Sequence, residues 1–154
     1  MSGNAPEIDL PQLPNARVAI ISSSWHLDIC NDLVAGAQRA LKGASISNVK
    51  VIYVPGSFEI PLAAQIAFEK SFNAVVAVGL VLEGETPHFD YVCQGVTQGV
   101  MDVSLKFSSP IGFGVLMCNT LDQAIARSGR PGSSEDKGYD SAVAAIKLLQ
   151  LKEG

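Results

Sequence analysis

Four short runs of apolar, mainly β-branched residues are the feature that most constrains this chain. They read VAIIS, VKVIYV, AVVAVGLVL and IGFGVLMC, and they cover residues 18–22, 49–54, 74–82 and 111–118. Most of them are continuously apolar rather than alternating, which is typical of strands covered on both faces, as in a parallel sheet. Helical patterns separate the runs, so the order of elements predicts right-handed crossovers and one doubly wound parallel sheet.

The helices between these strands are predicted from the spacing of apolar residues. The longest is expected over 88–107, where apolar residues recur at i, i+3, i+4 and i+7. Gly95 and Gly99 lie four residues apart on it and predict close packing against a neighbouring helix. The other helices are expected at 28–42, 58–69, about 121–128 and about 134–151.

Length and composition limit the class of protein. A chain of 154 residues suits one domain. Its charged fraction of 17% is below the usual ~25%, which fits a small enzyme with buried strands or an oligomer that hides part of its surface. The net charge of -4, without any run of Lys or Arg, argues against a nucleic-acid partner. The longest apolar run, 74–82, is far short of the ~20 residues of a membrane span, so we expect no membrane partner.

The N-terminal segment and the cysteines indicate a cytoplasmic protein. The first fifteen residues contain three prolines and no apolar stretch of a signal peptide, so we expect an arm over 1–15 and one domain over 16–154. The arm is either disordered or held by a partner. Cys30, Cys93 and Cys118 are widely spaced, which does not suit a disulfide framework or a metal site. We expect them to behave as small buried apolar residues in a reducing compartment.

Ligands of parallel sheets lie beyond the carboxyl ends of the strands, and the third junction, LEGETPHFD, is the most informative. We expect Thr86 to cap the following helix and Pro87 to fit its first turn. Gly84 lets the backbone approach a ligand, and the free amides near a helix start favour an anion. His88 suits proton transfer near neutral pH. An ordinary capped helix, with His88 satisfied by a local hydrogen bond, is the alternative.

The other junctions carry weaker signals. Trp25, the only tryptophan, offers a stacking face to an aromatic ring, or it covers the core. Ser57 is expected to cap a helix, and Glu59 pairs with a ligand N–H group or with the helix dipole. Arg127 and Lys137 follow the last strand, and arginine suits a phosphate, although a solvated surface pair is the alternative. His26 receives no role.

Three longer stretches, VPGSFEIPLAAQ, GLVLEGETPHFDYVCQGVTQG and NTLDQAIARSG…EDKG, resemble the lumazine synthase family of riboflavin biosynthesis. The resemblance extends from about residue 17 to residue 149, with the motifs in the family's order and spacing. It implies a single-domain, three-layer, flavodoxin-like α/β fold with four parallel strands flanked by helices. It also implies a transferase that uses no metal and no organic cofactor. The expected reaction condenses 5-amino-6-(D-ribitylamino)uracil with 3,4-dihydroxy-2-butanone 4-phosphate, giving 6,7-dimethyl-8-ribityllumazine, phosphate and water.

The resemblance also implies the roles of the site residues. Trp25 stacks on the pyrimidine ring, and His88 acts as the proton donor. The residues that hold the pyrimidine and its ribityl chain are Ser57, Phe58, Glu59, Leu80, Val81 and Leu82.

The phosphate of the second substrate is assigned to two sets of residues. Glu85 and Thr86 hold it through the amides of the helix start. Phe113, Arg127 and Lys137 come from the neighbouring subunit, with Arg127 on the phosphate.

One position departs from the family, and the assembly has two alternatives. Glu83 stands where the family commonly has a basic residue, and we expect its side chain to point away from the pocket, toward another subunit. We expect a homopentamer with active sites at subunit interfaces, because the segment RPGSSEDK is longer than the turn of shell-forming relatives. The alternatives without catalysis are a flavin- or lumazine-binding module and a shell-forming protein.

Overall fold

The computed structural model describes residues 6–154 and contains all the predicted strands and helices. The elements follow in this order: β1 (Arg17–Ser23), α1 (Leu27–Gly43), β2 (Asn48–Val54), the 3-10 turn η1 (Ser57–Glu59), α2 (Ile60–Glu69), β3 (Ala74–Leu82), α3 (His88–Phe107), β4 (Ile111–Cys118), α4 (Leu121–Arg127) and α5 (Lys137–Glu153). The strands agree with the sequence prediction to within a residue.

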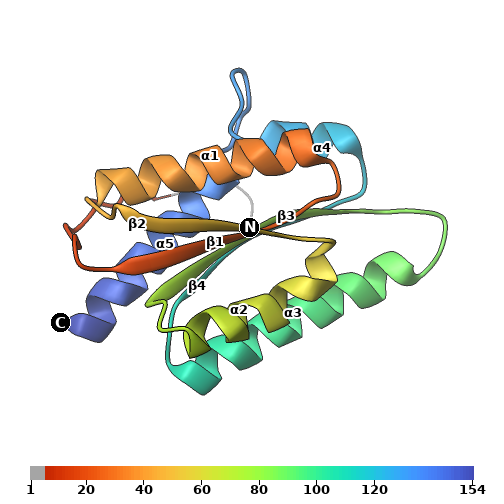
Figure 1. The fold of residues 1–154 in the computed structure, drawn as a ribbon. Coiled ribbons are helices and arrows are strands. Elements are labelled where there is room, and N and C mark those ends of the chain that lie inside the picture. Colours follow the sequence, from red (N-terminus) through yellow and green to blue (C-terminus); the bar gives the residue numbers. More distant parts are fainter. Residues whose placement is uncertain (1–5) are drawn as a thin grey trace.

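The four strands form one parallel sheet in the order β2-β1-β3-β4. Helices α1, α4 and α5 cover one face of the sheet, and α2 and α3 cover the other (Figure 1). This arrangement confirms the predicted three-layer, doubly wound α/β fold. Every crossover returns the chain to the same end of the sheet, so the segments that follow the four strands lie at one edge of the molecule.

The core consists of two apolar clusters, one on each face of the sheet. The central strand β3 serves both, because alternate side chains point to opposite faces. Val76 and Val78 pack toward α1 and α5, whereas Val75 and Ala77 pack toward α2 and α3. All the residues of β3 are buried except the last, which explains its continuous apolar sequence.

Strand β2 is more exposed than the prediction of a fully covered strand. It lies at the edge of the sheet and pairs only with β1. Its burial alternates between exposed and half-buried positions, and Tyr53 is 49% exposed. An edge strand extends beyond the helices that cover the sheet centre, so part of its side-chain surface remains open in the single chain.

The glycines of α3 make the predicted close contact. A methyl group on Gly95 would lie 2.5 Å from the ring of Phe58, and one on Gly99 would lie 2.7 Å from Pro61. The absence of both side chains therefore lets η1 and α2 pack directly on α3. This contact places the η1 turn beside the first turns of α3.

The described part of the N-terminal segment packs on its own chain. Leu10 and Leu13 contact the cluster under α1, and the amide of Leu13 donates to the carbonyl of Ala44 at 2.9 Å. Gln12 donates to the carbonyl of Gly43 at 3.0 Å. The division of the chain at residues 15 and 16 stays a prediction. Over residues 6–154, the chain contains no helix with the length and apolarity that a membrane crossing requires.

The crossing of α5 over α1 depends on Gly138, and its substitution should destabilise the fold. A methyl group at this position would lie 2.0 Å from the carbonyl oxygen of Leu33, which belongs to a backbone that cannot yield easily. We expect Gly138→Ala to lower the free energy of unfolding by about 1–3 kcal/mol, as measured by urea denaturation at fixed protein concentration. Gly84→Ala is the control, since no atom lies within 4 Å of its new methyl group. Equal stabilities of the two variants would contradict this account.

Candidate active site

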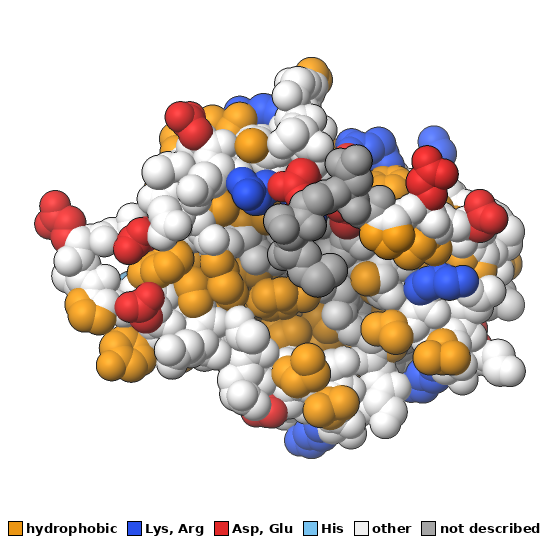
Figure 2. All heavy atoms as spheres, turned by 180° about the vertical axis from the view of Figure 1, so that it is seen from behind, with side chains coloured by type: hydrophobic (Ala, Val, Ile, Leu, Met, Phe, Trp, Pro, Cys, Tyr) orange, Lys and Arg blue, Asp and Glu red, His pale blue; other side chains and the backbone are white. Residues whose placement is uncertain are grey.

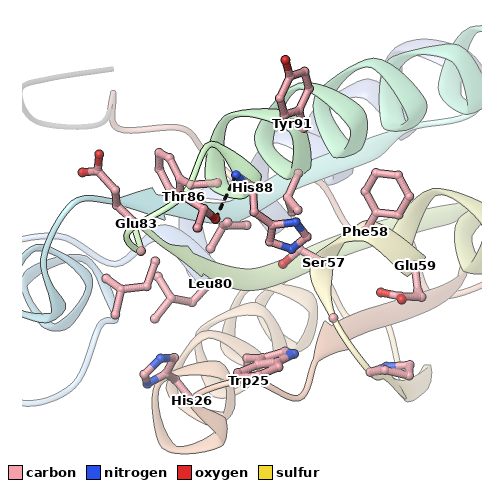
Figure 3. Close-up of a pocket in the computed structure, with 17 residues that line it drawn as sticks. Trp25, His26, Ser57, Phe58, Glu59, Leu80, Glu83, Thr86, His88 and Tyr91 are labelled. Carbon is pink, nitrogen blue, oxygen red and sulfur yellow. Dashed lines mark hydrogen bonds between the residues drawn. The ribbon is translucent and has the colours of Figure 1, made fainter.

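A pocket of about 730 Å³ lies beyond the carboxyl ends of the strands, where the junctions after β1, β2 and β3 meet. It is large enough for a drug-sized ligand. The residues that line it are Trp25, His26, Pro55, Gly56, Ser57, Phe58, Glu59, Leu80, Val81, Leu82, Glu83, Gly84, Thr86, His88, Phe89, Tyr91 and Val92. Figure 3 shows Trp25 on one side of this pocket and His88 with Thr86 on the opposite side.

The turn after β1 presents Trp25 to the pocket. Ser24 fixes this turn to the end of β2, because its hydroxyl donates to the carbonyl of Val54 at 2.8 Å. The thiol of Cys30 donates to the carbonyl of Trp25 at 3.2 Å. His26 follows in a left-handed conformation with φ of 53°, and α1 begins after it. The indole is 68% exposed, so Trp25 forms a face at the pocket rather than a cover for the core.

Ser57 does not cap a helix, and this part of the prediction was wrong. The residue lies in η1, a turn before α2 begins, and neither helix start has a side-chain cap. Its hydroxyl is instead directed toward Gly79 of β3, where an added methyl group would lie 2.9 Å from it. Among residues 6–154, the Ser57 hydroxyl is the one buried side-chain polar atom that has no hydrogen-bond partner. The deficit costs about 1–3 kcal/mol, and rotation of this side chain toward the pocket would let the hydroxyl bond a ligand there.

Thr86 was predicted as the cap of α3, but Pro87 occupies that position. Thr86 lies one residue earlier, and its hydroxyl accepts a hydrogen bond from the amide of His88 at 3.4 Å. The proline cannot donate a backbone hydrogen bond, so the helix tolerates it before its first turn. His88 is the first residue of α3, and its imidazole lines the pocket.

Glu83 lines the pocket, but Figure 3 shows its carboxylate turned away from His88 and Trp25. The carboxylate accepts a hydrogen bond from the side-chain amide of Asn119, at the end of β4. The expected outward direction is therefore confirmed, and the partner in this structure belongs to the same chain. Contact of Glu83 with another subunit stays a prediction.

The remaining predicted residues do not line this pocket. Glu85 is exposed on the turn before α3, and Phe113 lies at a second hollow of about 500 Å³ between α3, β4 and α5. Arg127 and Lys137 lie at the end of α4 and the start of α5, and both form ion pairs with Glu135. The resemblance assigns Phe113, Arg127 and Lys137 to the pocket of a neighbouring subunit, and that assignment stays a prediction.

The pocket of the single chain offers an anion no cationic side chain. No Lys or Arg is among the residues that line it, and Glu59 adds a carboxylate, whereas the carboxylate of Glu83 points away. A phosphate dianion in this pocket would therefore need positive charge from outside the chain. No group of three or more potential metal-ligating side chains is gathered within residues 6–154.

The cysteines show no reactive character. Burial raises the pKa of the Cys30, Cys93 and Cys118 thiols, so they remain protonated at neutral pH. All three are free, and Cys30 supports the Trp25 turn through its hydrogen bond. This structural role agrees with their prediction as small buried residues, although Cys93 is only half-buried.

Among the lining residues that the sequence did not predict, Tyr91 and His26 carry polar groups. Tyr91 is 69% exposed, lies three positions after His88 and lines the rim of the pocket, with its hydroxyl pointing outward in Figure 3. His26 lines the pocket beside Trp25. The three-residue spacing from His88 could have placed Tyr91 near the pocket. No sequence feature indicated the left-handed conformation of His26.

Comparisons with known proteins indicate the family. The family model for 6,7-dimethyl-8-ribityllumazine synthase matches residues 15–153. A 6,7-dimethyl-8-ribityllumazine synthase of Streptomyces coelicolor is 49% identical over 147 residues, which cover 95% of this chain and 91% of the relative. Enzymes of the same name from an Arthrobacter species and a Mycobacterium species are 51% and 46% identical. They cover 95% and 100% of this chain, and 94% and 97% of their own lengths, respectively.

Proposed function

This chain belongs to the 6,7-dimethyl-8-ribityllumazine synthase family, and from that membership we propose how its pocket carries out the reaction. The chain is a transferase of riboflavin biosynthesis. It condenses 5-amino-6-(D-ribitylamino)uracil with 3,4-dihydroxy-2-butanone 4-phosphate and forms 6,7-dimethyl-8-ribityllumazine, phosphate and water. A flavin-binding module or a shell protein without catalysis is not favoured, since the relatives are named as synthases.

The observation that carries this assignment is the pocket between Trp25 and His88. It combines an exposed indole, an unsatisfied buried hydroxyl on Ser57 and an imidazole at a helix start. An aromatic face suits a flat pyrimidine, and a free hydroxyl suits a polar ring edge. The direct test is to supply the purified chain with both substrates and to measure the fluorescent lumazine formed. Binding of the lumazine without turnover would contradict the assignment.

We assign the pyrimidine and its ribityl chain to the inner part of the pocket. Trp25 stacks on the ring, and the Ser57 hydroxyl bonds to a polar group at the ring edge. The other residues that contact this substrate are Phe58, Glu59, Leu80, Val81 and Leu82, all of which line the pocket. Glu59 accepts hydrogen bonds from N–H or O–H groups, since an ionised carboxylate can only accept.

The phosphate of the butanone substrate lies at the turn before α3 in this proposal. Gly84 leaves open space there, because no atom lies within 4 Å of the position of a side chain. The amides of Glu85 and Thr86 bind phosphate oxygens near the positive end of the helix dipole. His88 then moves protons while the amine attacks the carbonyl, phosphate leaves and the ring closes. Holding two intrinsically reactive substrates in register supplies much of the catalysis, so we propose that neither a metal nor an organic cofactor takes part.

The missing positive charge supports an active site shared between subunits. Arg127 and Lys137 carry such charge but do not line the pocket of their own chain, and neither does Phe113. In a ring with rotational symmetry each subunit can contribute one half-site to each neighbour. We therefore propose that Phe113, Arg127 and Lys137 complete the pocket of the next subunit, with Arg127 on the phosphate.

A homo-oligomer also explains the exposed apolar side chains. Leu62, Tyr91, Met101 and Leu105 project from α2 and α3 and are between 55% and 70% exposed. Figure 2 shows further hydrophobic side chains across the opposite side of the molecule from the view of Figure 1. Apolar surface of this extent is typical of subunit contacts. We also propose a cytoplasmic enzyme, which the three free thiols support.

We predict that the assembly is a pentamer rather than a shell of sixty chains. The loop between α4 and α5 stands out from the body of the molecule as a narrow hairpin (Figure 1). Such a projection should obstruct the tilt that pentamers need to close into a sphere. Sedimentation should give the mass of five chains, and a particle in the megadalton range would contradict this prediction.

His88→Ala should lower turnover by about tenfold or more, because general acid–base groups typically contribute a hundredfold to ten-thousandfold and reactive substrates reduce the loss. The KM of the pyrimidine substrate should change little. His26→Asn is the matched control, since it removes the other histidine of the pocket and asparagine tolerates the left-handed backbone. An unchanged rate for His88→Ala across neutral pH would remove this residue from the mechanism.

Mixed oligomers should test the shared site. His88→Ala and Arg127→Ala are each expected to impair activity as uniform oligomers. In oligomers assembled at random from equal amounts of both, about a quarter of the sites should combine an intact His88 half with an intact Arg127 half. Activity above that of both parents is expected. Verified mixed oligomers without such a gain would show that the site lies within one subunit.

A further inference from the structure

The carboxylate of Glu135 forms ion pairs with Arg127 and Lys137, the two cations of the proposed phosphate half-site. The Oε2 atom of Glu135 lies 3.4 Å from Nε of Arg127, and its Oε1 atom lies 3.2 Å from Nζ of Lys137. A carboxylate and a phosphate both offer oxygens that bind an arginine and a lysine in this way. In the free chain Glu135 therefore takes the position of an anionic ligand between these two side chains.

The backbone fixes Glu135 in this place. Its amide donates to the carbonyl of Ala126 at 3.0 Å, and its carbonyl accepts from the amide of Gly129 at 3.1 Å. Ser128 and Asp136 form an antiparallel bridge around it. The side chain of Glu135 is only 20% exposed, unlike that of a freely solvated residue. These backbone contacts hold Glu135 at the base of the loop between α4 and α5.

The hydrogen-bonding capacity of the cations is only partly used. The guanidinium of Arg127 also donates through Nη1 to the carbonyl of Gln123 at 2.9 Å, which leaves its Nη2 donors available. Lys137 lies 3.9 Å from the carboxylate of Asp140 as well. Two positive and two negative groups thus form a cluster of zero net charge, which attracts a phosphate dianion less than two unpaired cations would.

We propose that Glu135 is an internal counter-ion that competes with phosphate for Arg127 and Lys137. The inference rests on the proposed function, in which these cations face the phosphate of the neighbouring pocket. Phosphate enters the site on one substrate and leaves it as a product. As the product leaves, Glu135 forms its ion pairs with Arg127 and Lys137 again. This competition makes the site bind phosphate more weakly than the two cations would without Glu135.

The test uses Glu135→Gln in the complete oligomer, with inorganic phosphate as the probe. The change removes one negative charge and keeps the shape of the side chain. We expect phosphate to bind about threefold more tightly or better, since ion pairs near a protein surface typically contribute a fewfold each. The measurements are the inhibition constant of phosphate against the butanone substrate and its Kd by equilibrium dialysis. The KM of the pyrimidine substrate should stay the same.

Two further variants serve as comparisons. Glu153→Gln removes the same charge at the far end of α5 and should leave phosphate binding unchanged. Asp140→Asn removes the weaker partner of Lys137 and should tighten phosphate binding to a smaller extent. It tests the same competition if Glu135→Gln does not assemble.

Arg127→Ala separates this inference from the function on which it rests. Weaker phosphate binding in Arg127→Ala, combined with tighter binding in Glu135→Gln, would support both. Weaker binding in Arg127→Ala with unchanged or weaker binding in Glu135→Gln would overturn the counter-ion role alone. Phosphate binding that is unaffected by Arg127→Ala would overturn the assignment of the half-site, and the role of Glu135 with it.

Discussion

The burial of both faces of the sheet is the constraint on which the rest of this structure depends. Strand β3 is buried along almost its whole length, so helices must cover it on each side. Parallel strands then require crossovers that all return to one end of the sheet. Three turns from distant parts of the sequence meet there and bring Trp25, Ser57 and His88 around one pocket. The site is thus a consequence of the way in which the core is covered.

The fold could be predicted from the sequence because its main signal is local. The apolar composition of runs such as AVVAVGLVL predicts buried strands. The spacing of apolar residues along α3 predicts an amphipathic helix. The exact first residues of the helices were harder to predict. The last helix was expected near residue 134 but begins at Lys137, where Asp136 caps it by accepting from the amide of Tyr139 at 3.3 Å. Several Ser and Asp residues nearby were equally plausible caps.

The site was predictable where a motif and a strand end coincide, as at His88 and Thr86. Ser57 shows the limit. Its hydroxyl turns away from the helix because Gly79 on another strand leaves space for it, and such a contact is not visible in a local pattern. Glu135 shows a second limit, since in the segment RPGSSEDK it resembles one more solvated charge. Its fixed position comes from hydrogen bonds to Ala126 and Gly129, which only the folded loop supplies.

The placement of the single tryptophan has a practical consequence. Because Trp25 is the only indole in the chain and lies at the pocket with 68% of its surface exposed, the ultraviolet emission of tryptophan comes from one known position. A flat molecule that stacks on this ring removes water from it and alters that emission. The fluorescence of Trp25 therefore reports whether a ligand is bound in the pocket of its own subunit, and it can be measured in the unmodified protein without a label.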